Sequence, residues 1–392
     1  MLSVGVDQVR RFRLRAHHLD RSYDVRDALA LAGACGMQNT PPGAWEAALF
    51  NRASTFREKD AERLLYGEKS LVQAWSLRGA PVVFPAAESD AFLSALVPRD
   101  GEPWIYTNGI RLALDALGMG FDEALDLMRR ATALLDERSV ASKAALDQVL
   151  ADAVEPLLPE GKRAAWREPS MYGSPDRQTV GGAAVSFLLR PCSFLGLVVF
   201  GERDGVAPTF TSYRRWLGRA LEPADDAAER LVRKFVHCYG PTRPDALAKQ
   251  LGCSGAQARR LWKLVADELE PVGFGDGRAW ALAADRDALA SSGWPERRLL
   301  LLAAHDPYLD QRDRATLQAD RALQRRIWRT VANPGVVVRD GEAVGVWTSK
   351  KQARGLTISC EVWSPCDEAR LRALAEEYAA FREQPLLSVS FG

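Results

Sequence analysis

The segment from Gly240 to Asp285 most restricts how this chain can fold. A short helical stretch at residues 244–250 is followed by a turn and a second predicted helix, Gly255–Leu269, whose apolar residues recur at three- and four-residue spacing. The hydroxyl of Ser254 can cap this second helix by accepting from its first free N–H groups. Two short apolar runs joined by an Asp-Gly turn come next, a typical hairpin pattern. The order helix, turn, basic helix, hairpin predicts a winged helix-turn-helix.

The second helix of this unit carries a basic face. Gln257, Arg259, Arg260 and Lys263 lie opposite its apolar stripe. In winged-helix proteins this helix enters the major groove, so the three cations are candidate DNA contacts. The alternative is a helix-turn-helix that serves only packing or dimerisation.

A similar order of elements is predicted twice more upstream. The N-terminal helices and apolar runs fall at about residues 7–19, 25–35, 44–52, 71–77 and 80–84. The middle elements are a helix from Ser142 to Val154, a helix over 182–190 and a hairpin over 195–211. No residue-level repeat accompanies this order. It nevertheless predicts a tandem array of three winged-helix units.

The C-terminal part has a different pattern. Runs at 335–338, 343–348 and 356–362 predict a strand meander, and a helix is expected at about 366–383. A predicted loop between the last two strands carries Lys350, Lys351 and Arg354. These cations fit either a solvated turn or a hairpin tip that contacts DNA phosphates.

The length of 392 residues exceeds one ordinary core, since domains average roughly 100–200 residues. We predict four segments: 1–120 and 121–222 as the first two winged-helix units, 223–290 as the third, and 291–392 as an α+β segment with the basic hairpin. The fold class is therefore mainly α with small β-hairpins (α+β), a tandem winged-helix array with a strand-rich C-terminal segment.

Composition excludes several classes of protein. No apolar run reaches the roughly 18–20 residues that span a bilayer, and no signal peptide is visible, so a cytoplasmic, nucleoid-associated protein is expected. The six cysteines form no C-x-x-C pair and have no histidine at zinc spacing, which predicts neither a metal site nor a disulfide framework. Dinucleotide, phosphate-loop and serine-hydrolase motifs are missing, which argues against a metabolic enzyme. The net charge of +1 decides nothing, because DNA binding needs only local basic surface.

Several stretches, in order along nearly the whole chain, resemble the AlkZ/YcaQ-type DNA glycosylases, which are winged-helix DNA-binding proteins. The stretches that carry the resemblance are Leu2–Ala16, Gly36–Pro42 with Ala48–Arg52, Trp75–Gly79, His237–Thr242, Asp306–Leu309 with Arg312–Arg314, and Asp340–Trp347. The resemblance implies a monofunctional glycosylase that removes alkylated purines, including bulky adducts or interstrand crosslinks in some members.

The catalytic motif of that family is Gln, an apolar residue, then Gln or Asp. An N7-alkylated purine is cationic and leaves readily, so the protein need only position a water at the sugar C1′ and stabilise an oxocarbenium-like state. A carboxamide can orient that water, and an Asp can also act as a base.

In this chain the motif reads Gln38, Asn39, Thr40. The resemblance makes Gln38 and Thr40 the predicted catalytic residues. A threonine hydroxyl can hold a water but cannot act as a base at neutral pH. Thr40 also precedes Pro41 and Pro42, which fits a helix N-cap, and Gln38 could instead be a loop amide that satisfies backbone groups.

Two functions therefore remain open. The first is a glycosylase that hydrolyses the N-glycosidic bond of alkylated purines in duplex DNA, without a metal or organic cofactor. The second is a non-catalytic winged-helix DNA-binding protein, a regulator or lesion-sequestering factor that has lost the catalytic motif. No lysine lies in the motif, so a lyase-type amine nucleophile is not expected. In both cases the partner is duplex DNA, no membrane is involved and the protein is a monomer.

Overall fold

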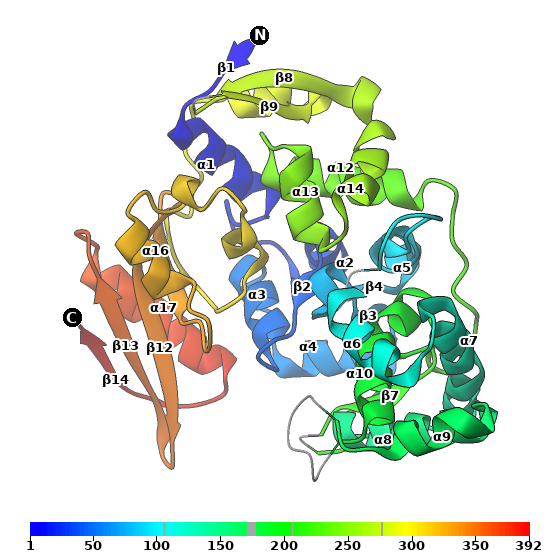
Figure 1. Cartoon of the computed structure of the whole chain (residues 1–392). Coiled ribbons are helices and arrows are strands. Elements are labelled where there is room, and N and C mark those ends of the chain that lie inside the picture. The colour runs from blue at the N-terminus through cyan, green and yellow to red at the C-terminus, as the bar shows by residue number, and fades with distance from the viewer. Residues whose placement is uncertain (105–106, 171–177, 206, 276) are drawn as a thin grey trace.

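The structure is a computed structural model that describes residues 1–104, 107–170, 178–205, 207–275 and 277–392 (Figure 1). Helices and four sheets alternate over these residues; three of the sheets have three strands and the fourth has five. The predicted mixture of helices with small hairpins is confirmed at this level. The interpretation as repeated winged-helix units and the four segment boundaries stay predictions. Val206 and Asp276, from two predicted hairpins, lie outside the described residues.

The helix-turn-helix region has the predicted order of elements. They are α12 (Ala227–Tyr239), α13 (Pro244–Leu251), α14 (Gly255–Lys263), β8 (Leu269–Phe274) and β9 (Gly277–Leu282). Ser254 caps α14, with its Oγ accepting from the Gln257 N–H at 3.0 Å. The prediction that α14 extends to Leu269 is wrong, because Leu269 pairs with Leu282 as the first residue of β8. Val265 lies beyond the end of α14 but packs in the same hydrophobic core as Leu261 and Trp262.

The N-terminus lies against this later region. β1 (Leu2–Ser3) pairs in parallel with β8, and α1 (Val6–Ala16) packs on α12 and α15 (Arg286–Ala290). Spacing along the sequence cannot predict this contact, because the partners are more than two hundred residues apart.

Residues 25–104 form the part of the fold that carries the predicted catalytic motif. Its main elements are α2 (Ala28–Gly33), β2 (Met37–Gln38), α3 (Ala44–Arg52), α4 (Glu58–Glu62), β3 (Leu71–Trp75), β4 (Pro81–Pro85) and α5 (Ser89–Phe92). The predicted helix 25–35 is divided into a 3-10 turn (Val25–Asp27) and α2. β2 was not predicted. It forms because Met37 and Gln38 pair with Val83 and Val82 of β4.

The middle segment is mostly helical. Its elements are α6 (Thr107–Leu117), α7 (Phe121–Ala131), β5 (Val140–Ala141), α8 (Lys143–Val154), α9 (Glu160–Arg167), α10 (Val180–Phe194), β6 (Val199–Phe200), β7 (Thr209–Thr211) and α11 (Tyr213–Leu217). The Ser142 cap and the end of its helix at Val154 are confirmed. The helix predicted for 182–190 is longer at both ends.

The C-terminal segment is a five-stranded sheet with α17 packed against it. Its elements are β10 (Leu299–Leu302), α16 (Arg321–Ile327), β11 (Gly335–Arg339), β12 (Glu342–Gln352), β13 (Gly355–Val362), α17 (Glu368–Phe381) and β14 (Leu386–Phe391). The predicted basic loop is wrong for Lys350 and Lys351, which lie in β12 opposite Thr357 and Leu356. Backbone pairing continues to Gln352, so only Ala353 and Arg354 form the turn. The β12–β13 hairpin projects beyond its neighbours at the bottom of Figure 1.

A buried ion pair ties α3 to the C-terminal segment. The Arg52 guanidinium makes two hydrogen bonds with the Asp306 carboxylate, at 2.8 and 3.0 Å, and both side chains are at most 1% exposed. Arg52 also donates to the His17 carbonyl at 2.8 Å. Asp306 in turn accepts from the Tyr308 N–H. The segment after Asp306 is thereby held beside α3 and β2.

Asp306→Asn is expected to lower the free energy of unfolding by about 3–5 kcal/mol, because it leaves the Arg52 charge buried without its partner. Urea unfolding followed by circular dichroism measures this change. The matched control is Glu377→Gln, which breaks an exposed ion pair with Arg370 and should cost less than about 1 kcal/mol. Equal losses in both variants would contradict the role assigned to the buried pair.

Candidate catalytic cavity and nucleic-acid interface

A cavity of about 340 Å³ lies where the end of β2 meets the C-terminal segment. Gln38 and Arg78 line it from the N-terminal half of the chain. Its polar lining from the C-terminal half consists of His305, Asp310, Arg312, Arg314, Arg329 and Asn333. The cavity therefore exists only where two distant parts of the sequence meet.

Gln38, Arg78 and Asp310 form one connected set of side chains. The Gln38 Oε1 accepts from the Arg78 Nη2 at 3.0 Å, and the same nitrogen lies 2.6 Å from the Asp310 Oδ2. Arg78 sits in the turn between β3 and β4 with φ of 55°, a left-handed conformation that side chains other than glycine adopt rarely. The Gln38 carboxamide oxygen and the Asp310 carboxylate oxygen thus contact the same guanidinium group at the cavity wall.

Positive charge dominates this cavity. Among its described lining residues, Asp310 is the single carboxylate against four arginines. Arginine suits bidentate contact with phosphate, so the wall is chemically fit for a DNA backbone. Burial lowers the pKa of His305 below its ordinary value. The imidazole is therefore neutral near pH 7 and can both donate and accept a hydrogen bond.

The structure changes the view of the rest of the predicted motif. Thr40 is exposed and is not among the residues that line the cavity. The interpretation of Thr40 as a helix cap is wrong, because α3 begins after Gly43, and the Gly43 N–H donates to the Asn39 Oδ1 at 2.7 Å. Asn39 is buried and also donates to Gln73 at 3.0 Å. The middle motif residue therefore fixes the loop that follows Gln38.

Gln250 of α13 connects the helix-turn-helix to this cavity. Its carbonyl accepts from the Arg78 Nη1 at 3.2 Å, and its Oε1 accepts from the Arg312 Nε at 2.9 Å. Its own amide donates to the Tyr239 hydroxyl at 3.3 Å. Neither Gln250 nor Asp310 has a local sequence signal, because their roles depend on partners far away in the chain.

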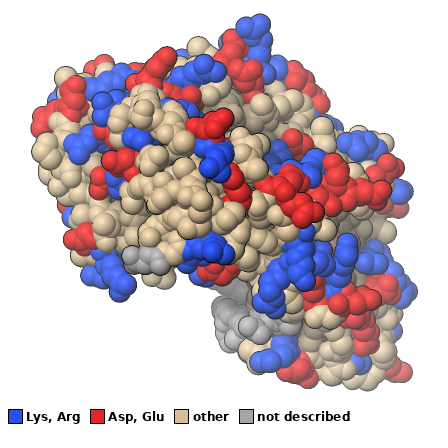
Figure 2. All heavy atoms as spheres, turned by 90° about the horizontal axis from the view of Figure 1, so that it is seen from above, with Lys and Arg blue, Asp and Glu red and all other residues tan. Residues whose placement is uncertain are grey.

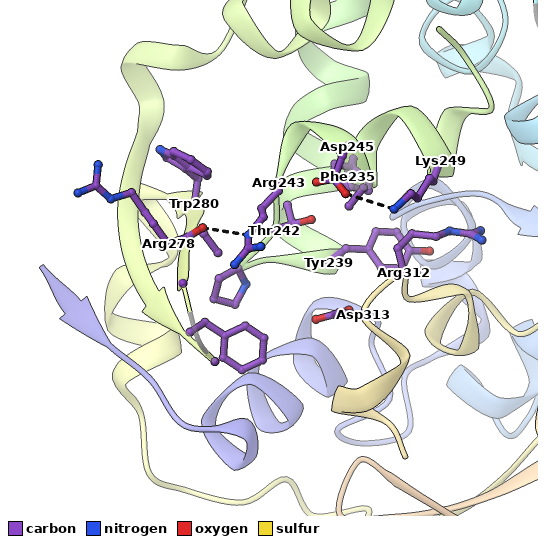
Figure 3. A pocket seen from close by; sticks show the side chains of 16 residues that line it. Phe235, Tyr239, Thr242, Arg243, Asp245, Lys249, Arg278, Trp280, Arg312 and Asp313 are labelled. Carbon is purple, nitrogen blue, oxygen red and sulfur yellow. Dashed lines mark hydrogen bonds and ion pairs between the residues drawn. The ribbon is translucent and has the colours of Figure 1, made fainter. Parts of the chain in front are cut away.

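A second cavity, of about 640 Å³, lies between α13 and the β8–β9 hairpin (Figure 3). Aromatic side chains and cations line it together: Phe235, Tyr239, Phe274, Trp280, Arg243, Lys249, Arg278 and Arg312. The Arg243 Nε donates to the Arg278 carbonyl at 2.9 Å, which links the start of α13 to β9. Arg312 lines both cavities.

The predicted DNA contacts of α14 differ in how accessible they are. Arg259 and Lys263 are exposed. Arg260 makes two hydrogen bonds of 2.8 Å with the Glu102 carboxylate. Gln257 does not belong to the exposed face, because its side chain is buried and donates to the Leu96 carbonyl. Part of the predicted basic face of α14 is thus covered by residues 96–102.

The other predicted contacts lie at the end of the long hairpin. Lys350, Lys351 and Arg354 are all exposed. On the face drawn in Figure 2, Lys and Arg side chains form separate groups between acidic ones instead of a continuous basic surface. Such local groups agree with a net charge of +1.

Within the described residues, no helix is both long and apolar enough to cross a membrane.

The overall fold matches that of a solved protein over the full length of the chain. Streptomyces sahachiroi DNA glycosylase AlkZ superposes with a TM-score of 0.76 at 20% sequence identity, and the match covers 100% of both chains. The family model described as DNA glycosylase AlkZ-like matches residues 31–381. This chain therefore belongs to the AlkZ-like DNA glycosylase family, which confirms the resemblance seen in the sequence. No curated protein matches it.

Proposed function

We propose that this protein is a monofunctional DNA repair glycosylase that hydrolyses the N-glycosidic bond of N7-alkylated purines in duplex DNA, bulky or crosslinked bases included. The observation that carries the proposal is the position of Gln38. Its carboxamide lines a cation-rich cavity and contacts the same Arg78 guanidinium as the Asp310 carboxylate. Family membership supports the same activity.

In this mechanism Gln38 orients the attacking water and Asp310 supplies the negative charge. The sugar becomes oxocarbenium-like as the cationic base leaves, so a nearby carboxylate stabilises the transition state and can accept the proton of the water. Asp310 thus takes the part that the family motif gives to its third residue, since Thr40 lies outside the cavity.

In the DNA-free protein, Arg78 donates hydrogen bonds to the Gln38 Oε1 and to the Asp310 Oδ2. A DNA phosphate competes for that guanidinium, because phosphate accepts bidentate hydrogen bonds from arginine. Binding of the damaged strand would then free the Gln38 and Asp310 oxygens for the water. Arg312, Arg314 and Arg329 remain at the wall to hold the backbone.

The test is base release from a duplex that carries N7-methylguanine. The expected result is strand cleavage only after alkaline treatment, because a monofunctional enzyme leaves an intact abasic strand. Cleavage without alkali would contradict the monofunctional mechanism. A duplex with a bulky N7 adduct, run in parallel, tests the wider substrate range.

The exposed position of Thr40 favours one competing function, a DNA-binding protein that has lost the chemistry. It predicts salt-sensitive binding of duplex DNA and no abasic product from either lesion. A regulator would also prefer one sequence by about 10³-fold or more over random DNA. Release of the base by the wild-type protein would exclude this function.

We propose that the β12–β13 hairpin contacts DNA phosphates through Lys350, Lys351 and Arg354, with Arg259 and Lys263 of α14 as further contacts. Arg260 can join them only by leaving Glu102. Reversing Lys350 and Lys351 to Glu is expected to weaken duplex binding and to reduce the slope of log K against log salt by about 2, one for each lost phosphate contact.

Fluorescence anisotropy across a salt series measures this slope. The matched control reverses Lys59 and Arg111, two exposed cations on α4 and α6, and so changes the net charge equally. An unchanged affinity for the hairpin variant at low salt would remove the hairpin from the interface.

A further inference from the structure

The fold brings together three potential metal ligands that are far apart in the sequence. They are His17, Cys35 and Cys238. One ring nitrogen of His17 and the two cysteine Sγ atoms all lie within 4.8 Å of one another. Sequence spacing predicted no metal site, because residues 17, 35 and 238 form no local motif.

Each ligand comes from the end of a different element. His17 directly follows α1, Cys35 lies in the turn between α2 and β2, and Cys238 is the penultimate residue of α12. His17 is fully buried and packs edgewise against the rings of Tyr239 and Tyr308, at centroid distances of 5.0 and 5.5 Å. These contacts fix the plane of the imidazole.

The imidazole of His17 lacks ordinary hydrogen-bond partners. Its Nδ1 lies 3.7 Å from the Cys35 Sγ, and its Nε2 is buried without a partner among the described residues. A buried polar ring normally costs free energy unless its nitrogens are satisfied. A cation bound at Nδ1 would satisfy the side that faces the two sulfurs and leave the Nε2 proton against the aromatic rings, a weak but favourable contact.

We propose that His17 Nδ1, Cys35 Sγ and Cys238 Sγ bind one zinc ion. Imidazole nitrogen and thiolate sulfur are the donors that zinc prefers, and a water or main-chain carbonyl can complete the tetrahedron. Binding releases the two thiol protons to solvent. The resulting group of Zn²⁺ and two thiolates has no net charge, so its burial avoids the large cost of an isolated ion.

The ion would stabilise the part of the fold that supports the candidate catalytic cavity. Cys35 is three residues before Gln38, and Arg52 joins the His17 carbonyl to Asp306. The metal would therefore hold the ends of α1, α2 and α12 together beneath the strand that carries Gln38. This inference does not depend on the activity proposed above.

The experiment is a Co²⁺ titration of the full-length protein after metal has been removed with a chelator under reducing conditions. The expected result is one equivalent of Co²⁺ per chain, with a thiolate-to-cobalt charge-transfer band and the visible bands of tetrahedral cobalt, all displaced by Zn²⁺. Cys35→Ser and Cys238→Ser should abolish these bands. The matched controls Cys253→Ser and Cys366→Ser, at cysteines outside the cluster, should keep them.

A second measurement needs no variant, which matters if a serine in the core prevents folding. Alkylation of the partly exposed Cys35 is followed by mass spectrometry with Zn²⁺ or with chelator present. Zinc should slow the labelling of Cys35 and leave that of Cys366 unchanged. No charge-transfer band together with equal labelling rates would overturn the proposal, as would bands that persist in both Cys35→Ser and Cys238→Ser.

Discussion

Gln38→Ala should lower the rate of base release from N7-methylguanine DNA by about 10²–10³-fold, the cost typical of removing one oriented hydrogen-bonding group from a transition state. The side chain ends at the wall of the cavity and contacts Arg78, so its loss removes the polar group that orients the water in the proposed mechanism. Single-turnover rates at saturating enzyme isolate this effect from binding.

The affinity for damaged duplex should change little in Gln38→Ala, because the arginines that line the cavity remain. The matched control is Gln148→Ala, which removes the same side chain from an exposed position on α8 and should leave the rate unchanged. If Gln38→Ala and wild type release base at equal rates, Gln38 is a structural amide and the catalytic assignment is wrong.

Asp310→Asn should reduce base release by about 10²–10⁴-fold, the range expected when a general base is lost. The change keeps the size of the side chain but removes the negative charge beside the developing oxocarbenium. It also removes the 2.6 Å ion pair that Asp310 forms with Arg78 in the DNA-free protein.

The decisive comparison for Asp310 is Thr40→Ala. Because Thr40 is exposed and does not line the cavity, its loss should change the rate less than about threefold, well under the span that one catalytic group contributes. A large loss in Thr40→Ala with little change in Asp310→Asn would reverse the assignment and return the third motif position to the chemistry.

Local patterns predicted those parts of the fold that depend on neighbours in the sequence. The cap at Ser254 and the helix that ends at Val154 follow from hydrophobic spacing and capping residues. The end of α14 was misplaced because β8 continues the same apolar spacing into the same core. Helical and strand patterns cannot be distinguished over so short a run.

The candidate site was predictable only in part. Gln38 is found by resemblance, because its motif is contiguous. Asp310 and Gln250 acquire their roles only through Arg78, which contacts both of them in the fold. The strand continuation through Lys350 and Lys351 was missed because exposed polar residues on a long hairpin look like a loop.

The order of the cavity residues along the chain also determines when the cavity can form during synthesis on the ribosome. Gln38 is synthesised early, whereas Asp310 and the last lining residue, Val336, appear only after most of the chain has been made. The Arg52–Asp306 pair, which holds the two parts together, forms equally late. A nascent or truncated chain that lacks these late residues therefore cannot form the complete cavity. The cavity that we propose for catalysis is thus completed only near the end of synthesis.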